Sequence, residues 1–233
     1  MYIRSSDNQS WTTRGSPING ENAGDKFGHS VSLSGDGNIL ASSAKQYGEN
    51  NGDLQGKVRI FSFNNSTANW NQLGVNIIGE ENDESGLVVT ISSDGSVVVI
   101  GSPGNANRAG VVRAYTFQNN SWTQQGNDIV GESDNDRVGS GPFQSIAMSS
   151  DGSILAVGAW LNEEDKGDTE NDNDSLRIFA LDGSNWAQRG RTIRGEMAKD
   201  KLGRVVSISA DGNIIVVSMN EKSEMNLTLA KAV

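Results

Sequence analysis

The stretch that decides the fold is Trp11-Thr12-Thr13-Arg14-Gly15-Ser16-Pro17-Ile18-Asn19-Gly20-Glu21, because its pattern returns three more times along the chain. In every copy a Trp is followed by Gly, Ile, Gly and Glu at the same spacing, and the later copies begin at Trp70, Trp122 and Trp186. Four copies with identical internal spacing predict a chain built from four similar units of about 58 residues.

A second repeated feature is an Asp-Gly pair between two apolar runs. Gly accepts the positive φ that a tight turn requires, so this pair predicts a β-hairpin. The run Val97–Ile100 after one of these pairs is apolar without a break, which predicts a strand buried on both faces. The four pairs are Asp36-Gly37, Asp94-Gly95, Asp151-Gly152 and Asp211-Gly212.

A third pattern, in which Arg lies between apolar residues, marks a further strand in three of the units: Val58-Arg59-Ile60-Phe61, Val112-Arg113-Ala114-Tyr115 and Leu176-Arg177-Ile178-Phe179. Each unit then has strand A before Asp-Gly, strand B after it, strand C with the Arg, and strand D with the Trp and Ile. Repeated units of four antiparallel strands predict an all-β fold, a β-propeller of four four-stranded blades. We expect one domain over 1–233, with repeats at approximately 11–63, 70–117, 122–181 and 186–229.

The two ends of the chain bear on whether the ring closes. The fourth repeat loses its pattern after strand B, although 226–229 resembles a degenerate strand C. Residues 1–10 could supply a closing strand to that last blade, which predicts a closed four-bladed ring and a monomer. The alternative is a fragment of a larger propeller, whose open edges would be exposed to pairing.

The composition limits the classes of molecule that the protein is expected to bind. The net charge of −10 disfavours nucleic acid and anionic membrane surfaces, and no apolar run approaches the length of a membrane span. Cations and basic protein patches remain candidates, although acidic loops also simply keep a β-protein soluble. The chain has no Cys, which excludes disulfides, thiolate metal sites and Cys nucleophiles.

The segment Phe27-Gly28-His29-Ser30-Val31 resembles the Phe-Gly half of FG-GAP repeats, the blades of integrin α-subunit-type propellers. Weaker versions are Val138-Gly139 and Leu202-Gly203. The second half, a small-residue corner after strand B, is matched by Ala41-Ser42-Ser43-Ala44, Gly101-Ser102-Pro103 and Gly158-Ala159. The resemblance covers about 11–217 and is divergent.

This resemblance implies partner binding on the face that carries the B–C and D–A loops. It also implies a ring of seven blades and calcium in the A–B loops. The A–B links here, such as 34–38, are short and hold one carboxylate each, whereas calcium needs six to eight oxygen ligands. We therefore expect no cofactor; the family-type calcium loops are not evident, and calcium remains the one candidate ion.

The D–A loops repeat a Glu followed four residues later by an acid, and this pattern has two interpretations. A ring of carboxylates could bind cations or a basic partner. Alternatively, the Glu pairs with a neighbouring Arg and the acid caps the turn. The pairs are Glu21 with Asp25, Glu80 with Glu84, Glu132 with Asp136 and Glu196 with Asp200.

The B–C loops differ between repeats, and variable loops on a rigid scaffold often determine specificity. The longest, from Leu161 to Asp174, is strongly acidic. Its candidate metal ligands are Asp168, Glu170, Asp172 and Asp174, and its candidate ligand-binding residues are Trp160, Glu163 and Asp165. Trp160 could stack on a sugar or anchor a partner, or be a packed loop residue. A solvated acidic loop is the alternative for the carboxylates.

No catalytic residues are expected. His29 is the only His, and neither a Ser-His pair nor a zinc site can be built around it from the sequence. Sequons at Asn8, Asn64, Asn65, Asn119, Asn173 and Asn226, with the family resemblance, favour an extracellular or cell-surface location. The sequence thus predicts a non-enzymatic interaction or adhesion module that binds a protein partner. The alternatives are a carbohydrate-binding propeller and a hydrolase that uses loop carboxylates.

Overall fold

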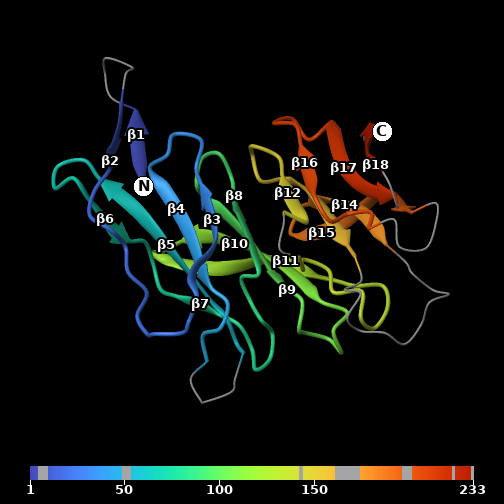
Figure 1. Ribbon diagram of the computed structural model, residues 1–233, viewed down its shortest axis with the longest axis horizontal. Helices are drawn as coiled ribbons and strands as arrows, with labels where there is room; N and C mark the ends of the chain where they lie inside the picture. The colour runs from blue at the N-terminus through green and yellow to red at the C-terminus, as the bar shows by residue number, and fades with distance from the viewer. Residues whose placement is uncertain are drawn as a thin grey trace.

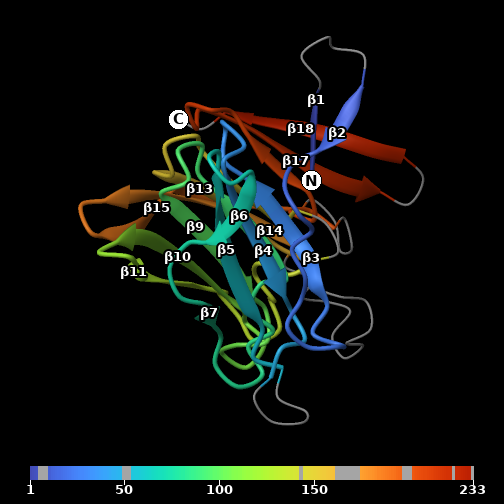
Figure 2. The ribbon, with the colours of Figure 1, turned by 90° about the vertical axis from the view of Figure 1, so that its left-hand side faces the viewer.

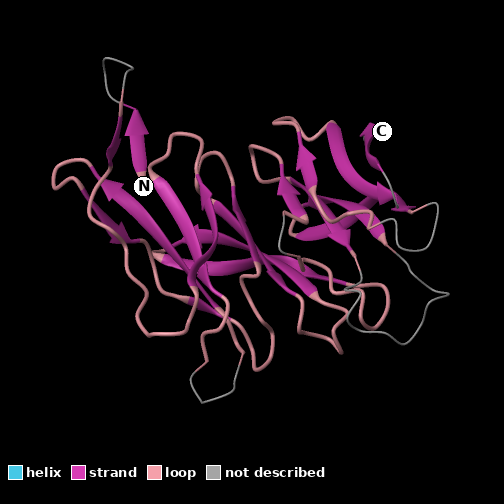
Figure 3. Ribbon diagram, in the orientation of Figure 1, coloured by secondary structure: helices cyan, strands magenta, loops and turns pink. Residues whose placement is uncertain are grey.

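The computed structural model describes residues 1–4, 10–48, 54–141, 144–160, 174–195, 201–221 and 224–231. These residues form strands, turns and loops, and no helix occurs among them (Figure 3). The strands group into four antiparallel sheets arranged in sequence order, plus a two-stranded hairpin at the N-terminus (Figure 1). Each of the four sheets corresponds to one predicted repeat and is called a blade below.

The order of strands is A-B-C-D in the first three blades, as predicted, and A-B-C among the described residues of the fourth. The hairpin is β1 (Tyr2–Arg4) and β2 (Trp11–Thr13), and the first blade is β3 (Phe27–Leu33), β4 (Ile39–Ala44), β5 (Lys57–Asn64), β6 (Asn69–Gln72) and β7 (Ile77–Ile78). The second is β8 (Val88–Ile91), β9 (Val97–Ser102), β10 (Val111–Gln118) and β11 (Ser121–Val130). The third is β12 (Ile146–Met148), β13 (Ile154–Ala159), β14 (Ser175–Asp182) and β15 (Asn185–Arg194), and the fourth is β16 (Val206–Ile208), β17 (Ile214–Glu221) and β18 (Glu224–Lys231).

The fourth blade departs from the expected closure of the ring. The chain's own C-terminal segment supplies strand C as β18, which pairs with β17 along its whole length. The N-terminal strand β1 pairs with β2 instead. Among the described residues the termini therefore do not pair, and the hairpin and the fourth blade lie on opposite sides of Figure 1. Figure 2 shows the same blades turned by a quarter turn.

Strand A of each blade is the inner strand, because β3, β8, β12 and β16 contact one another in succession. The turns after these strands are linked by a series of backbone hydrogen bonds that passes from blade to blade. Gly35 N donates to Ser93 O (2.7 Å), Ser93 N to Ser150 O (2.9 Å), and Ser150 N to Ala210 O (2.9 Å). The same contact thus recurs at each of the three blade junctions.

The repeated Trp residues hold the outer parts of neighbouring blades together. Each indole N–H donates to a carbonyl three residues after the Trp position of the previous repeat: Trp70 to Arg14 O (3.0 Å), Trp122 to Leu73 O (2.9 Å) and Trp186 to Gln125 O (3.0 Å). The ring lies against the register Gly of that previous repeat, at Gly15, Gly74 and Gly126. Each such Gly has a φ near +75°, which Gly adopts without strain.

The two halves of the Phe-Gly pattern meet across the same junctions. Gly139 and Gly203 have φ of +72° and +87°, and each approaches the small-residue corner of the preceding blade. A Cβ on Gly139 would lie 2.8 Å from Gly101 Cα, and one on Gly203 would lie 2.9 Å from Gly158 Cα. The spacing of the two small-residue motifs is therefore explained by close backbone packing between blades.

Candidate functional site

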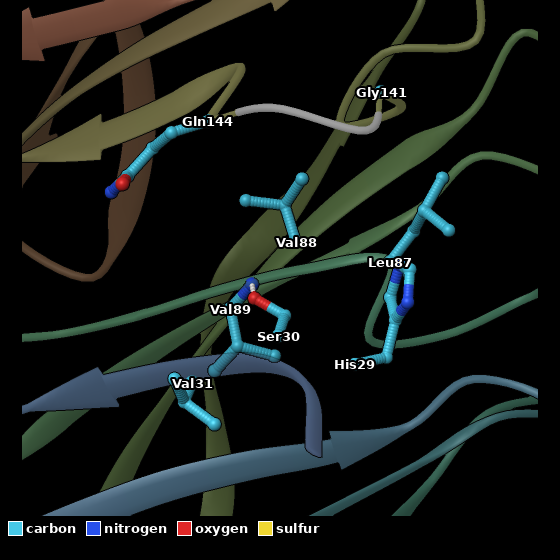
Figure 4. A pocket seen from close by; sticks show the side chains of 8 residues that line it. All are labelled: His29, Ser30, Val31, Leu87, Val88, Val89, Gly141 and Gln144. Carbon is cyan, nitrogen blue, oxygen red and sulfur yellow. Dashed lines mark hydrogen bonds between the residues drawn. The ribbon is translucent and has the colours of Figure 1, made fainter. Parts of the chain in front are cut away.

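The candidate site is a pocket of about 230 Å³ between the inner strands of the first two blades and the segment that leads into the third (Figure 4). The volume suits a small ligand. The lining residues come from the middle of β3, from the start of β8 and from the segment before β12. They are His29, Ser30, Val31, Leu87, Val88, Val89, Gly141 and Gln144.

A β-bulge places His29 in this pocket. The pairing of β3 with β4 shifts between Phe27 and Val31, and Gly28 within the bulge has a φ of +84°. The backbone N–H of His29 donates to Lys26 O (3.1 Å) instead of continuing the regular ladder. Bulges redirect side chains in this way and are frequent beside active sites.

The pKa of the His29 imidazole is lowered from its ordinary value, although the residue lies at the surface of β3. Burial lowers its pKa below 6.5, and the positive charge of Lys45 lowers the pKa further. A neutral imidazole has one nitrogen that can accept a proton, which is the property required of a general base. The site therefore has a candidate base that operates at physiological pH.

Two polar side chains complete the pocket. Ser30 Oγ accepts a hydrogen bond from Val89 N (3.0 Å), which leaves its O–H able to donate to a ligand. Gln144 lies on the opposite side of the pocket from His29 (Figure 4), and its backbone carbonyl accepts from Val206 N (2.8 Å). The pocket is thus lined by an imidazole and a hydroxyl, while the amide end of Gln144 points away from His29 in Figure 4.

Most of the candidate residues of the acidic B–C loop cannot be related to this pocket. Glu163, Asp165, Asp168, Glu170 and Asp172 lie outside the described residues. Asp174 is buried, and its Oδ2 accepts a hydrogen bond from the backbone N–H of Lys201 at 2.6 Å. The described residues contain no group of three or more His, Asp or Glu side chains placed to hold a metal ion.

Trp160 lies inside the protein in this structure, with 8% of its surface exposed. Its indole N–H points to Ser140 O (3.4 Å), and the guanidinium of Arg204 lies 5.1 Å from the ring centre. This placement matches the interpretation of Trp160 as a packed loop residue. Neither face of such a buried ring is presented for stacking on a sugar.

Two of the repeated acids of the D–A loops, Glu21 and Asp136, serve the scaffold. Glu21 pairs with Lys57 (2.5 Å) and, at 3.6 Å, with Arg59. Asp136 Oδ2 accepts from Ser133 N (2.9 Å), and burial raises the pKa of Asp136. The interpretation of this pattern as ion pairs and turn caps is confirmed for these residues.

The Asp of each A–B turn is likewise occupied within its own turn. Asp36 accepts hydrogen bonds from Ser34 Oγ (2.6 Å) and Asn38 N (2.9 Å), and these bonds lower its pKa to about 2. Asp211 repeats the arrangement with Ser209 Oγ (2.5 Å), and its pKa is also lowered to about 2. These carboxylates stabilise the hairpin turns between strands A and B, and neither of them lines the pocket.

Sequence comparison adds no family: no family model and no curated protein matches the chain. Solved structures do match. A protein assigned as a 6-phosphogluconolactonase from Bacteroides uniformis aligns over 99% of this chain and 64% of its own, at 14% identity and a TM-score of 0.56. The chain has a β-propeller fold. A protein from Lactobacillus plantarum aligns over 100% of this chain and 62% of its own, at 11% identity and the same TM-score of 0.56.

A third solved propeller also matches the chain. Sqt1 of Chaetomium thermophilum, solved with the N-terminus of a ribosomal protein, covers 87% of this chain and 45% of its own, at 17% identity and a TM-score of 0.53. The chain spans less than two thirds of the length of these structures. No described helix is long and apolar enough to cross a membrane. The FG-GAP integrin type is not among these three propellers.

Two functional predictions are corrected by this comparison. The sequence predicted a non-enzymatic adhesion module and no enzyme, whereas the Bacteroides uniformis propeller, which aligns over 99% of this chain, is assigned as a 6-phosphogluconolactonase, a hydrolase. The alternative of a hydrolase accords better with that finding. The loop carboxylates on which that alternative relied do not line the described pocket, which is lined by His29 instead.

Sequence reasoning missed the pocket because its residues come from three repeats. His29 was set aside since no nucleophile lies near it in sequence. One sequence signal could have pointed to the pocket: the residue directly after the motif Gly differs in every repeat. These residues are His29, Leu87, Ser140 and Arg204. A position that varies so widely beside an invariant scaffold Gly is typical of a binding site.

Proposed function

We propose that this protein is a hydrolase of small sugar lactones, with the pocket at His29 as its active site and His29 as the general base. The observation that carries the proposal is the placement of His29, whose pKa is lowered by partial burial and by Lys45, in a small pocket beside the inner strands of the first two blades. The likeness to a propeller assigned as a 6-phosphogluconolactonase supports the substrate class.

The chemistry requires few groups. A lactone is an intramolecular ester, so its hydrolysis needs a water molecule, a base to remove a proton from that water, and donors to the carbonyl oxygen. His29 takes the proton while the water oxygen attacks the carbonyl carbon. The Ser30 hydroxyl is the donor available to the substrate. The ring C–O bond then breaks, and the proton on His29 passes to the alcohol oxygen that leaves.

Replacing the base tests this assignment. We expect the wild type to hydrolyse 6-phosphogluconolactone or gluconolactone above the spontaneous rate, and His29→Gln to lower kcat by about 100-fold or more, the usual contribution of a general base. Acid release is followed with a pH indicator, and reactions without protein give the spontaneous rate.

The fold of this variant is checked separately, because loss of activity through unfolding would be uninformative. His29 is a surface-accessible residue of β3, so the melting temperature of His29→Gln should stay within a few degrees of the wild type. Equal turnover by wild type and a folded His29→Gln protein would contradict the role of His29. Absence of turnover by the wild type on both lactones would overturn the proposed function.

The charge of Lys45 provides a second test. Removing it in Lys45→Met should raise the pKa of His29 toward its ordinary value of 6.5, since one of the two causes of the lowered pKa is lost. The acid limb of the activity profile should then move to higher pH. His29 is the only His, so its imidazole signal can be titrated directly by NMR.

Lys26→Met is the matched control for this experiment. It removes the same charge close to His29 in sequence, yet only Lys45 contributes to the lowered pKa of His29. An equal rise in the two variants would show that the effect is one of overall charge and would contradict the specific role of Lys45.

We also propose that the repeats are divergent FG-GAP-type blades. The support is the meeting of the two half-motifs across blade junctions, at Gly139 with Gly101 and at Gly203 with Gly158. Gly28 has the same positive φ at the corresponding position of the first blade.

A further inference from the structure

Lys45 lies beside the bulge that carries His29. It directly follows β4, whose last residue, Ala44, pairs with Phe27 at the start of β3, where the bulge begins. The positive charge of Lys45 also reaches the imidazole, since it lowers the pKa of His29. The backbone pairing and this electrostatic effect agree in placing the ammonium group next to the proposed base.

The ammonium group of Lys45 has no carboxylate partner in the part of the chain that the structure describes. The chain has 29 Asp and Glu residues against 19 Lys and Arg, so acidic partners are plentiful. Other cations use them, as Lys57 does with Glu21 and Arg113 does with Asp83. Lys45 is half-buried, and water screens such a charge less than an exposed one. A ligand with a negative charge would supply the missing partner.

The scaffold does not require a lysine at this position. The residue directly after strand B and the residue directly after the motif Gly both differ in the next two blades. The pair is Lys45 with His29 in the first blade, Pro103 with Leu87 in the second, and Trp160 with Ser140 in the third. The cation and the proposed base therefore occur together in the first blade, and both are absent from these positions in the second and third.

We propose that Lys45 binds an anionic group of the substrate, so that the pocket prefers lactones carrying a phosphate or a carboxylate over neutral ones. This inference rests on the proposed hydrolysis of lactones. The described lining residues of the pocket other than His29 are uncharged, so recognition of an anion depends on a neighbouring cation. The net charge of −10 repels anions in general, and a local ammonium group offsets that repulsion at the site. An ammonium group is a point charge with three rotatable donors, so it accepts either kind of anion.

Three lactones test this preference: neutral gluconolactone, 6-phosphogluconolactone with its phosphate, and glucarolactone with its free carboxylate. We expect at least one of the anionic lactones to have a higher kcat/KM than gluconolactone with the wild type. Lys45→Met should lower the ratio of anionic to neutral kcat/KM by about 10- to 100-fold, the loss for one hydrogen bond to a charged group. A change in the pKa of His29 affects all three substrates alike, so it cancels in this ratio.

Two further variants separate contact from overall charge. Lys45→Arg keeps the positive charge and should keep most of the anionic preference. Lys26→Met removes an exposed cation from the facing segment, and exposed charges contribute little, so the ratio should change by about twofold or less. An equal fall of the ratio in Lys26→Met and Lys45→Met would show a general effect of charge and would contradict a contact with Lys45.

A measurement without turnover separates this inference from the proposed function. Inorganic phosphate is added to the folded protein, and the imidazole signal of His29, the only His, is followed by NMR. We expect a saturable shift in the wild type that Lys45→Met abolishes and Lys45→Arg retains. If this shift is seen but no lactone is hydrolysed, the proposed function fails and the anion site at Lys45 stands. If the lactones are hydrolysed with ratios that Lys45→Met does not change, the inference is overturned and the proposed function stands.

Discussion

Replacing Trp122 with Ala should lower the free energy of unfolding by about 3–5 kcal/mol, the range for deleting a large buried aromatic side chain. Trp122 is 6% exposed and donates a 2.9 Å hydrogen bond from its indole to Leu73 O. Its ring also packs on Phe117, with ring centres 5.0 Å apart. Since domains are stable by only about 5–15 kcal/mol, the variant should be close to unfolding at room temperature. Urea denaturation measures the change.

Trp11→Ala is the matched control for this prediction. The substitution and the register position are the same, but Trp11 is 68% exposed, so little buried surface is lost. Similar losses in the two would contradict the view that the Trp stabilises the fold through the junction with the preceding repeat.

Gly139→Ala should be the second most damaging change. Its φ of +72° strains any L-residue, at about 1–2 kcal/mol. The added methyl would also lie 2.8 Å from Gly101 Cα, where the obstacle is backbone and cannot move aside. Overpacking of this kind costs about 1–3 kcal/mol more. The expected result is a clear fall of the urea midpoint with an unchanged slope.

Gly28→Ala separates the two causes. Gly28 has the corresponding φ of +84°, yet nothing described lies within 4 Å of its Cβ position. It should therefore show only the backbone strain. If the protein loses as much stability from Gly28→Ala as from Gly139→Ala, close packing at the junction between the second and third blades is not the reason for the Gly.

Features that depend on residues close together in the sequence were predictable, whereas features that depend on residues far apart in the sequence were not. The four strands of a blade were predictable because each follows from local chemistry, as in the positive φ of Gly37 in its hairpin. The strand C of the fourth blade was not predictable with certainty, because both 226–229 and Tyr2–Arg4 resemble a strand C in sequence. Direct attachment to β17 through two residues decided between them.

The pocket could not be predicted for a different reason. The lining residues His29, Leu87 and Gln144 come from separate parts of the chain, and no spacing rule connects them. A bulge at Gly28 determines where His29 points, and the repeat pattern alone does not reveal that bulge. The acidic loops were conspicuous in the sequence, but the carboxylates described there are engaged by the scaffold, as Asp174 is by the Lys201 backbone.

The hydrogen bonds that pass from Gly35 through Ser93 and Ser150 to Ala210 have a consequence for how such a chain can change in evolution. Every junction uses the same donors, acceptors and glycines, so a duplicated or deleted repeat meets its new neighbour with contacts that already match. Stability in such an array is close to a sum of repeat and junction contributions. Gene duplication could therefore alter the number of blades in one step, without any compensating substitution at the new boundary.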